Sequence, residues 1–162
     1  MKNIFISTLF LGLFLTCTAC AKEIVGVVSK VADGDTLTLN ANGKKYKIRL
    51  AEIDTAERDQ PYGSEAKTVL SNLVLNKQVR VLVIKKSDRY GRVIGRIFLG
   101  EDDVNAYMVK MGHAMVYRRY LTDQSLLELE NNAKENQRGL WKLPQKDRVP
   151  PWVWRKLKRK KS

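Results

Sequence analysis

The sequence has very few residues that could form a disulfide or bind a soft metal. Only two of its 162 residues are cysteines, and both, Cys17 and Cys20, fall within the first twenty positions. The rest of the chain therefore offers no disulfide, no thiolate nucleophile and no cysteine-based zinc site.

Histidine is scarcer still, because His113 is the only one in the chain. Sites that need two or more histidines are thus excluded, whether for acid–base catalysis or for binding a metal. A Ser-His-Asp triad would have to use His113, which follows Gly112 among apolar residues. We interpret His113 as a structural residue.

Long hydrophobic runs are also missing, with one exception at the start of the chain. Ile4–Leu15 is almost wholly apolar, Lys2 precedes it, and small residues including Ala19 and Ala21 follow it. This pattern is typical of a secretory signal peptide and is too short for a membrane span. We expect residues 1–21 to be cleaved after Ala21 and the protein to be secreted or periplasmic.

Cys20 leaves an alternative open for this segment. A small residue precedes it at the end of the apolar run, as at the lipidation sites of bacterial lipoproteins, although Cys17 stands where those usually carry leucine. We favour simple secretion, and we expect membrane attachment only if Cys20 is lipidated. No obligate protein partner is evident, and we expect a monomer.

Positive charge is in excess, with 30 Lys and Arg against 17 Asp and Glu and a net charge of +13. Such a balance favours polyanionic partners. Seven of the basic residues lie between Arg148 and the C-terminus, where no acid occurs. We therefore divide the mature chain into a domain at 22–143 and a basic, tryptophan-containing tail at 144–162, which could bind nucleic acid, touch an anionic membrane or be disordered.

Hydrophobic periodicity predicts a small barrel of the OB type. Strand-like alternation is followed by an Asn42-Gly43 hairpin signal, and helical spacing begins near Tyr62. The predicted strands are 24–31, 36–39, 46–50, 78–85 and 92–99, and the predicted helices are 62–74, 104–111 and 123–137. Five strands with about three helices predict an α+β fold, a five-stranded Greek-key barrel with helices packed on it.

Acidic side chains gather in two turns of this barrel. Asp33 and Asp35 lie in one turn, and Glu52, Asp54 and Glu57 lie in the other. If the strands pair through the Asn42-Gly43 hairpin, both turns meet at the same end. Crowded oxygen ligands without histidine or cysteine suit a hard cation, calcium or magnesium.

Two arginines accompany these turns. Arg49 lies five residues before Asp54, and Arg92 closes the polar turn before the last predicted strand. A guanidinium fork matches the paired oxygens of a phosphate and can stabilise charge that develops during phosphoryl chemistry.

Together these residues resemble the staphylococcal (micrococcal) nuclease, or thermonuclease, family. The motifs that carry the resemblance are, in order, Asp33-Gly34-Asp35-Thr36, Arg49, Asp54-Thr55-Ala56-Glu57, Tyr62-Gly63 with Glu65-Ala66, and Asp88-Arg89-Tyr90-Gly91-Arg92. Each motif is short, but their order and approximate spacing agree over about residues 27–141.

The resemblance implies a calcium site and a catalytic base. Asp35 and Asp54 correspond to the carboxylates that bind Ca²⁺, with the backbone carbonyl of Thr55 as a further ligand. Glu57 corresponds to the general base that activates a water molecule.

The resemblance also implies a substrate and a product. Arg49 and Arg92 correspond to the pair that binds the phosphate, while Asp33 and Tyr90 hold supporting positions. The implied reaction is endonucleolytic hydrolysis of DNA and RNA that leaves 3′-phosphate ends.

Tyr117 and Tyr120 flank two arginines and could stack on substrate bases, although packing tyrosines are also common there. The alternative function is a non-catalytic OB-fold module that binds nucleic acid. A domain of that kind is expected to lack part of the catalytic set, whereas this sequence retains all of it.

Overall fold

The computed structural model describes residues 22–161. The predicted signal peptide, its cleavage after Ala21 and the lipidation of Cys20 lie outside the described residues.

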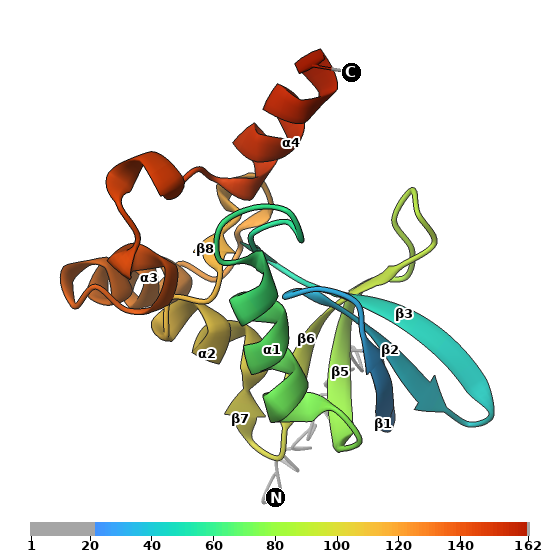
Figure 1. The fold of residues 1–162 in the computed structure, drawn as a ribbon. Coiled ribbons are helices and arrows are strands. Elements are labelled where there is room, and N and C mark those ends of the chain that lie inside the picture. The colour runs from blue at the N-terminus through green and yellow to red at the C-terminus, as the bar shows by residue number, and fades with distance from the viewer. Residues whose placement is uncertain (1–21, 162) are drawn as a thin grey trace, which may run out of the picture.

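Five strands form a closed barrel, which confirms the predicted fold class (Figure 1). These are β1 (Glu23–Val31), β2 (Thr36–Ala41), β3 (Lys44–Leu50), β5 (Gln78–Lys85) and β6 (Val93–Leu99). Neighbouring strands run antiparallel in the order β3-β2-β1-β5-β6, and a parallel pairing of β3 with β6 closes the barrel. Three two-residue strands complete the β-structure, namely β4 (Ile53–Asp54), β7 (Asp102–Asp103) and β8 (Met115–Val116).

The hairpin between β2 and β3 turns at Asn42 and Gly43, as predicted. Both residues have positive φ, 49° and 72°, which is the backbone geometry of the tightest hairpin turn. The turn fixes the register so that Thr36 lies opposite Arg49. The arginine is thereby placed beside the acidic turn that precedes β2.

The barrel interior is filled by alternate residues of its strands. Leu37, Leu39 and Ile48 have no exposed surface, and their polar neighbours point outward. Gly95 lies where β6 approaches β5, since a Cβ atom there would stand 2.5 Å from Cγ1 of Val81. That close approach explains a glycine inside a strand.

Four α-helices accompany the barrel in the described residues: α1 (Gly63–Val74), α2 (Val104–Lys110), α3 (Ser125–Glu135) and α4 (Pro151–Lys161). Helix α1 buries Ala66, Leu70 and Val74 against the core. Asp103 caps α2 by accepting a hydrogen bond from the backbone of Ala106, 2.9 Å away. Short 3₁₀ turns lie at Arg118–Tyr120, Gly139–Lys142 and Gln145–Asp147.

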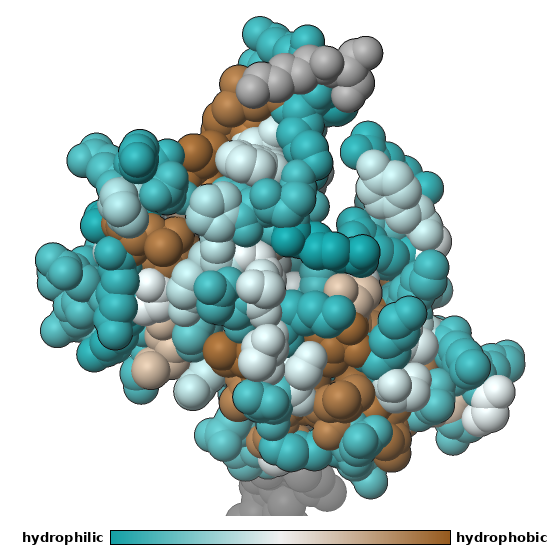
Figure 2. Space-filling view, viewed as in Figure 1, coloured by the Kyte–Doolittle hydropathy of each residue, from teal (hydrophilic) through white to brown (hydrophobic). Residues whose placement is uncertain are grey.

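Helix α4 projects from the molecule above β8 and the loop that leads into α1 (Figure 1). Hydrophobic residues run along one side of its surface and hydrophilic residues along the other (Figure 2). None of the helices within residues 22–161 is long and apolar enough to cross a membrane.

Candidate functional site

The two acidic turns meet at one end of the barrel, as the sequence predicts. Asp35 precedes β2, and its Oδ2 accepts hydrogen bonds from the backbone nitrogen and the hydroxyl of Thr55, at 3.0 and 3.1 Å. Asp35 is 6% exposed and Asp54 is 1% exposed. Gly34 permits this packing, because a Cβ there would lie 2.7 Å from the Thr55 hydroxyl.

Arg49 joins the two carboxylates from the neighbouring strand. Its Nε lies 3.2 Å from Oδ1 of Asp35, and its Nη2 lies 2.9 Å from Oδ1 of Asp54. Nη1 donates to the carbonyls of Leu50 and Ile53, at 2.6 and 2.9 Å. Arg49 therefore fixes the turn as well as offsetting its negative charge.

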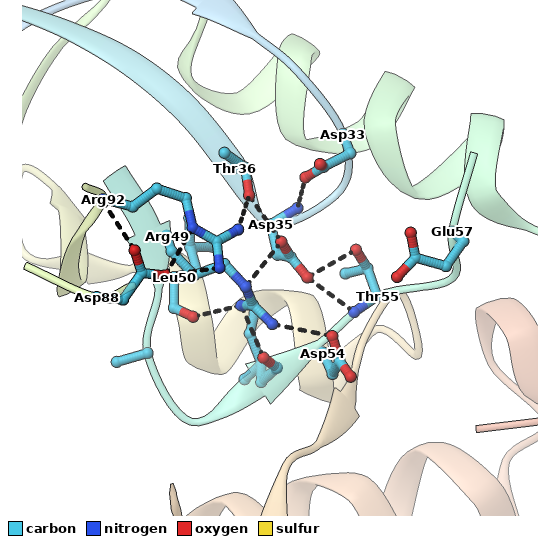
Figure 3. A network of polar contacts seen from close by, with 12 residues as sticks. Asp33, Asp35, Thr36, Arg49, Leu50, Asp54, Thr55, Glu57, Asp88 and Arg92 are labelled. Carbon is cyan, nitrogen blue, oxygen red and sulfur yellow. Dashed lines mark hydrogen bonds and ion pairs between the residues drawn. The ribbon is translucent and has the colours of Figure 1, made fainter. Parts of the chain in front are cut away.

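Arg92 approaches the same place from the turn before β6 (Figure 3). Its Nε and Nη2 lie 2.9 and 2.8 Å from Oδ2 of Asp88. Its Nη1 lies 3.5 Å from the hydroxyl of Thr36, which also contacts Asp35 at 3.0 Å. Tyr90 is 64% exposed, and its ring centroid lies 5.2 Å from Cζ of Arg92.

Burial raises the pKa of two acids in this cluster. Burial, and then repulsion from Asp35, raises the pKa of Asp33 to about 6. Burial also raises the pKa of Asp54, although hydrogen bonding from Arg155 and the charge of Arg49 oppose it. A cation bound here would stabilise the ionised carboxylates.

The donors suit a hard cation such as Ca²⁺. Asp35, Asp54 and the carbonyl of Thr55 offer only oxygen atoms, which is the chemistry that calcium and magnesium prefer. Within residues 22–161, no three Asp, Glu, His or Cys side chains are grouped closely enough to hold a metal by themselves. Two carboxylates would therefore need the Thr55 carbonyl and water to complete a coordination shell.

Glu57 lies on the loop between β4 and α1, with its carboxylate on the Thr55 side of the cluster (Figure 3). Its partner is Arg155 of α4, whose Nη1 lies 2.5 Å from Oε1 of Glu57. The same guanidinium pairs with Asp54 at 2.7 Å. Nothing in the sequence identified Arg155, because it is one of many basic residues in the tail, 98 positions from Glu57.

Two lysines beside the site were also not predicted from the sequence. A hollow of about 260 Å³ beside Arg92 is lined mainly by basic and polar residues, with two apolar ones, namely Lys30, Thr36, Thr38, Lys47, Tyr90 and Arg92 together with Ala32 and Leu37. Lys30 and Lys47 are cross-strand neighbours of Thr38 on either side. Strand register places such neighbours on one face, so the hairpin prediction could have found Lys47, while Lys30 also needs the pairing of β1 with β2. The hollow suits an anionic ligand.

Tyr117 and Tyr120 lie at the base of α4. Their rings meet edge to face, with centroids 5.0 Å apart. Trp152 stacks on Tyr117 at 5.3 Å with an interplanar angle of 3°, so one face of that tyrosine is covered. Tyr120 is 58% exposed and remains accessible.

His113 is engaged in packing. Its Nδ1 lies 2.9 Å from the hydroxyl of Tyr62, and the two rings stack with centroids 6.0 Å apart. Burial lowers the pKa of His113, so its ring is neutral at physiological pH. These contacts agree with the structural interpretation.

Comparison with known proteins points in the same direction as the geometry. Residues 47–143 match the family described as staphylococcal nuclease homologue. A protein of Escherichia coli named "Uncharacterized endonuclease" is 40% identical over 151 residues, which cover 93% of this chain and 96% of that protein. A "Micrococcal nuclease" of Shigella flexneri is 36% identical over 142 residues, covering 81% of this chain and 80% of that protein.

A further match comes from a plant. The "Probable staphylococcal-like nuclease CAN1" of Oryza sativa subsp. japonica is 39% identical over 142 residues, covering 83% of this chain and 41% of that protein. From the extent of these matches, we conclude that the chain belongs to the staphylococcal nuclease family.

Proposed function

We propose that the protein is an exported, calcium-dependent endonuclease that hydrolyses DNA and RNA and leaves 3′-phosphate ends. The observation that carries this proposal is the gathering of a complete set of groups at one end of the barrel. Asp35 and Asp54 supply oxygen ligands, Arg49 and Arg92 supply guanidinium groups, and Glu57 supplies a base. Export is supported by the composition of residues 1–21.

Ca²⁺ bound at Asp35, Asp54 and Thr55 would supply positive charge next to the phosphate and lower the pKa of a water molecule. Glu57 would accept the proton of the water that attacks phosphorus. The bond from phosphorus to the 5′ oxygen would break, this oxygen would take up a proton from solvent to become a 5′-hydroxyl, and the phosphate would stay on the 3′ oxygen. A carboxylate is a weak base, and it therefore depends on accurate placement of this water.

Arg92 is placed to hold the phosphate during this reaction. It is a quarter exposed, and it lines the hollow together with Lys30 and Lys47. Phosphates of a bound strand would occupy this basic hollow, where the positive charges of Arg92, Lys30 and Lys47 would offset their negative charge. Tyr90 and Tyr120 are both exposed, and their rings would stack on bases of the bound strand.

The second candidate function is a nucleic-acid-binding OB module without catalysis. It accounts for the basic hollow and the exposed tyrosines. It gives no reason for a buried Asp35–Arg49–Asp54 arrangement beside Glu57, since burying such charges has a free-energy cost that binding alone does not require.

The two functions can be separated by incubating the purified protein with DNA or RNA in calcium, in magnesium or in a chelator. We expect degradation of both polymers in calcium, loss of degradation in chelator, and ends that accept extension only after phosphatase treatment. Intact polymer in excess calcium, with retained binding, would establish the binding module instead.

A further inference from the structure

The guanidinium of Arg155 in α4 donates hydrogen bonds to the two acids that the proposed reaction needs. Nη2 lies 2.7 Å from Oδ2 of Asp54, and Nη1 lies 3.2 Å from Oδ1 of the same carboxylate. Nη1 also lies 2.5 Å from Oε1 of Glu57. One side chain thus covers both oxygens of a calcium-ligand candidate and one oxygen of the candidate base.

Several contacts dock α4 over the site. Trp152 stacks on Tyr117, and the side-chain amide of Gln60 donates to the carbonyl of Val149 just before the helix, at 2.5 Å. Farther along α4, Lys158 forms an ion pair with Asp59. Because these contacts flank Arg155 on both sides, the helix directs this arginine toward the acids.

A guanidinium that donates to both oxygens of a carboxylate competes with a divalent cation for their lone pairs, and its positive charge repels the cation. Oδ2 of Asp54 is taken by Arg155, while Oδ1 is shared between Arg155 and Arg49. The positive charge of Arg155 lies beside Asp54 and Glu57, where a bound cation would otherwise supply positive charge. Arg155 donates hydrogen bonds to both Asp54 and Glu57, and a guanidinium stays charged at every physiological pH.

We propose that Arg155 is a built-in competitor of the catalytic cation, and that α4 holds the cation-free site closed until Ca²⁺ displaces it from Asp54. The proposal rests on the calcium dependence proposed above. Glu57 is freed in the same step, so the base becomes available only when the cation is bound.

The contact is built to be reversible. Arg155 and Glu57 have side chains that are 38% and 36% exposed, so water screens their attraction and can replace it. Asp54 by contrast is 1% exposed and keeps Arg49 as a partner when Arg155 leaves. Displacement therefore does not leave a buried carboxylate without a counter-charge.

Competition lowers the apparent calcium affinity to the intrinsic affinity multiplied by the fraction of molecules in which Arg155 has left Asp54. Removing the competitor should therefore strengthen calcium binding, by about tenfold if roughly one molecule in ten is open. Calcium affinity of the full chain can be measured by isothermal titration calorimetry, without reference to activity. The variants are Arg155→Gln, which removes the fork and the charge, and Arg155→Lys, which keeps the charge alone.

Arg159→Gln is the matched control, because it removes one positive charge from the exposed part of the same helix. We expect the dissociation constant for calcium to fall about tenfold in Arg155→Gln and by a smaller factor in Arg155→Lys. Arg159→Gln should stay within about twofold of the unmodified chain. Circular dichroism and the thermal midpoint verify that each variant is folded.

Calcium binding that is unchanged or weaker in Arg155→Gln would overturn the competitor role and leave the proposed function intact. A gain in calcium affinity in Arg159→Gln equal to that in Arg155→Gln would also overturn it, because the effect would then come from charge at a distance. Absence of calcium binding in every variant would contradict the proposed function itself.

Discussion

Arg49 and Arg92 carry the same side chain but are held in different ways. Arg49 is 12% exposed and donates to two backbone carbonyls as well as to two carboxylates. Arg92 is 25% exposed, pairs with Asp88 and faces the basic hollow. Arg49 therefore organises the site, and Arg92 has more freedom to bind a ligand.

Replacing each arginine with lysine separates these contributions. Arg92→Lys should lower kcat/KM by roughly 100-fold, since a point charge lacks the fork, with little change in stability. Arg49→Lys should lower activity and also cost about 1–3 kcal/mol of unfolding free energy, because the carbonyls of Leu50 and Ile53 lose a donor. Steady-state kinetics and urea unfolding measure the two effects.

Arg89→Lys is the control for Arg92, since it makes the same change at an exposed position of the same turn. Arg89→Lys should leave kcat/KM and the free energy of unfolding near those of the unmodified chain. Equal stability of the Arg49 and Arg92 variants would contradict the structural role of Arg49.

At the residue scale, local pattern predicted some of the site and missed the rest. Asp35 and Asp54 could be placed together because one hairpin turn sets the register of both strands. Lys30 needed the pairing of β1 with β2 as well. Arg155 could not be predicted, because its position depends on how α4 docks and no periodicity in the sequence encodes that contact.

Among the elements, β8 determines where Asp54 lies. β4, which contains Asp54, pairs with β8, and the backbone nitrogen of Val116 in β8 donates to Glu130 of α3 at 2.9 Å. Glu130 is 1% exposed and also pairs with Arg118 and Lys134 at 2.8 and 2.7 Å. Helix α3 thus supports, through one buried carboxylate, the pair of strands that contains Asp54.

Glu130→Gln should destabilise the protein in a pH-dependent way. Burial alone would raise the pKa of Glu130, but its hydrogen bonds to Lys134, Val116 and Arg118 outweigh burial and hold the pKa below 4.5. A lowered folded-state pKa contributes stability above pH 4.5, which is lost as the pH falls through the folded value. The variant should cost about 1–3 kcal/mol at pH 7 and less at pH 3.

Urea unfolding at the two pH values measures this difference, with Glu135→Gln on the exposed surface of α3 as the control. A Glu130→Gln cost that is the same at pH 7 and pH 3 would mean that the ionised carboxylate is not the source of the stability.

The barrel strands could be predicted because each has a local sequence pattern. Asn42 and Gly43 predict the hairpin turn, and polar and apolar residues alternate in β2 and β3. Gly95 indicates close packing in β6. The signal was weaker after Trp141, where prolines and charges suggested only a tail. Helix α4 begins at one of those prolines, Pro151, a residue that favours the first turn of a helix.

For the whole molecule, the candidate groups converge on one end of the barrel from distant parts of the chain. The turn before β2, the end of β3, the turn before β6 and helix α4 each contribute a charged side chain. The barrel thus acts as a rigid frame for the acids and arginines, while α4 adds a contact that can be displaced. In the proposed mechanism, metal binding, release of the base and phosphate binding would be coupled, because Arg155 pairs with Asp54 and Glu57 and Arg49 pairs with Asp54.

The central claim is that Glu57 is the base of a phosphodiester hydrolysis at this site. The most direct measurement is the single-turnover rate of DNA cleavage by Glu57→Gln at saturating calcium, compared with the unmodified protein and with Glu65→Gln, an exposed change in α1. We predict that Glu57→Gln loses about 10²- to 10⁴-fold in rate while Glu65→Gln loses little. A Glu57→Gln variant that cuts DNA as fast as the unmodified protein would contradict the account.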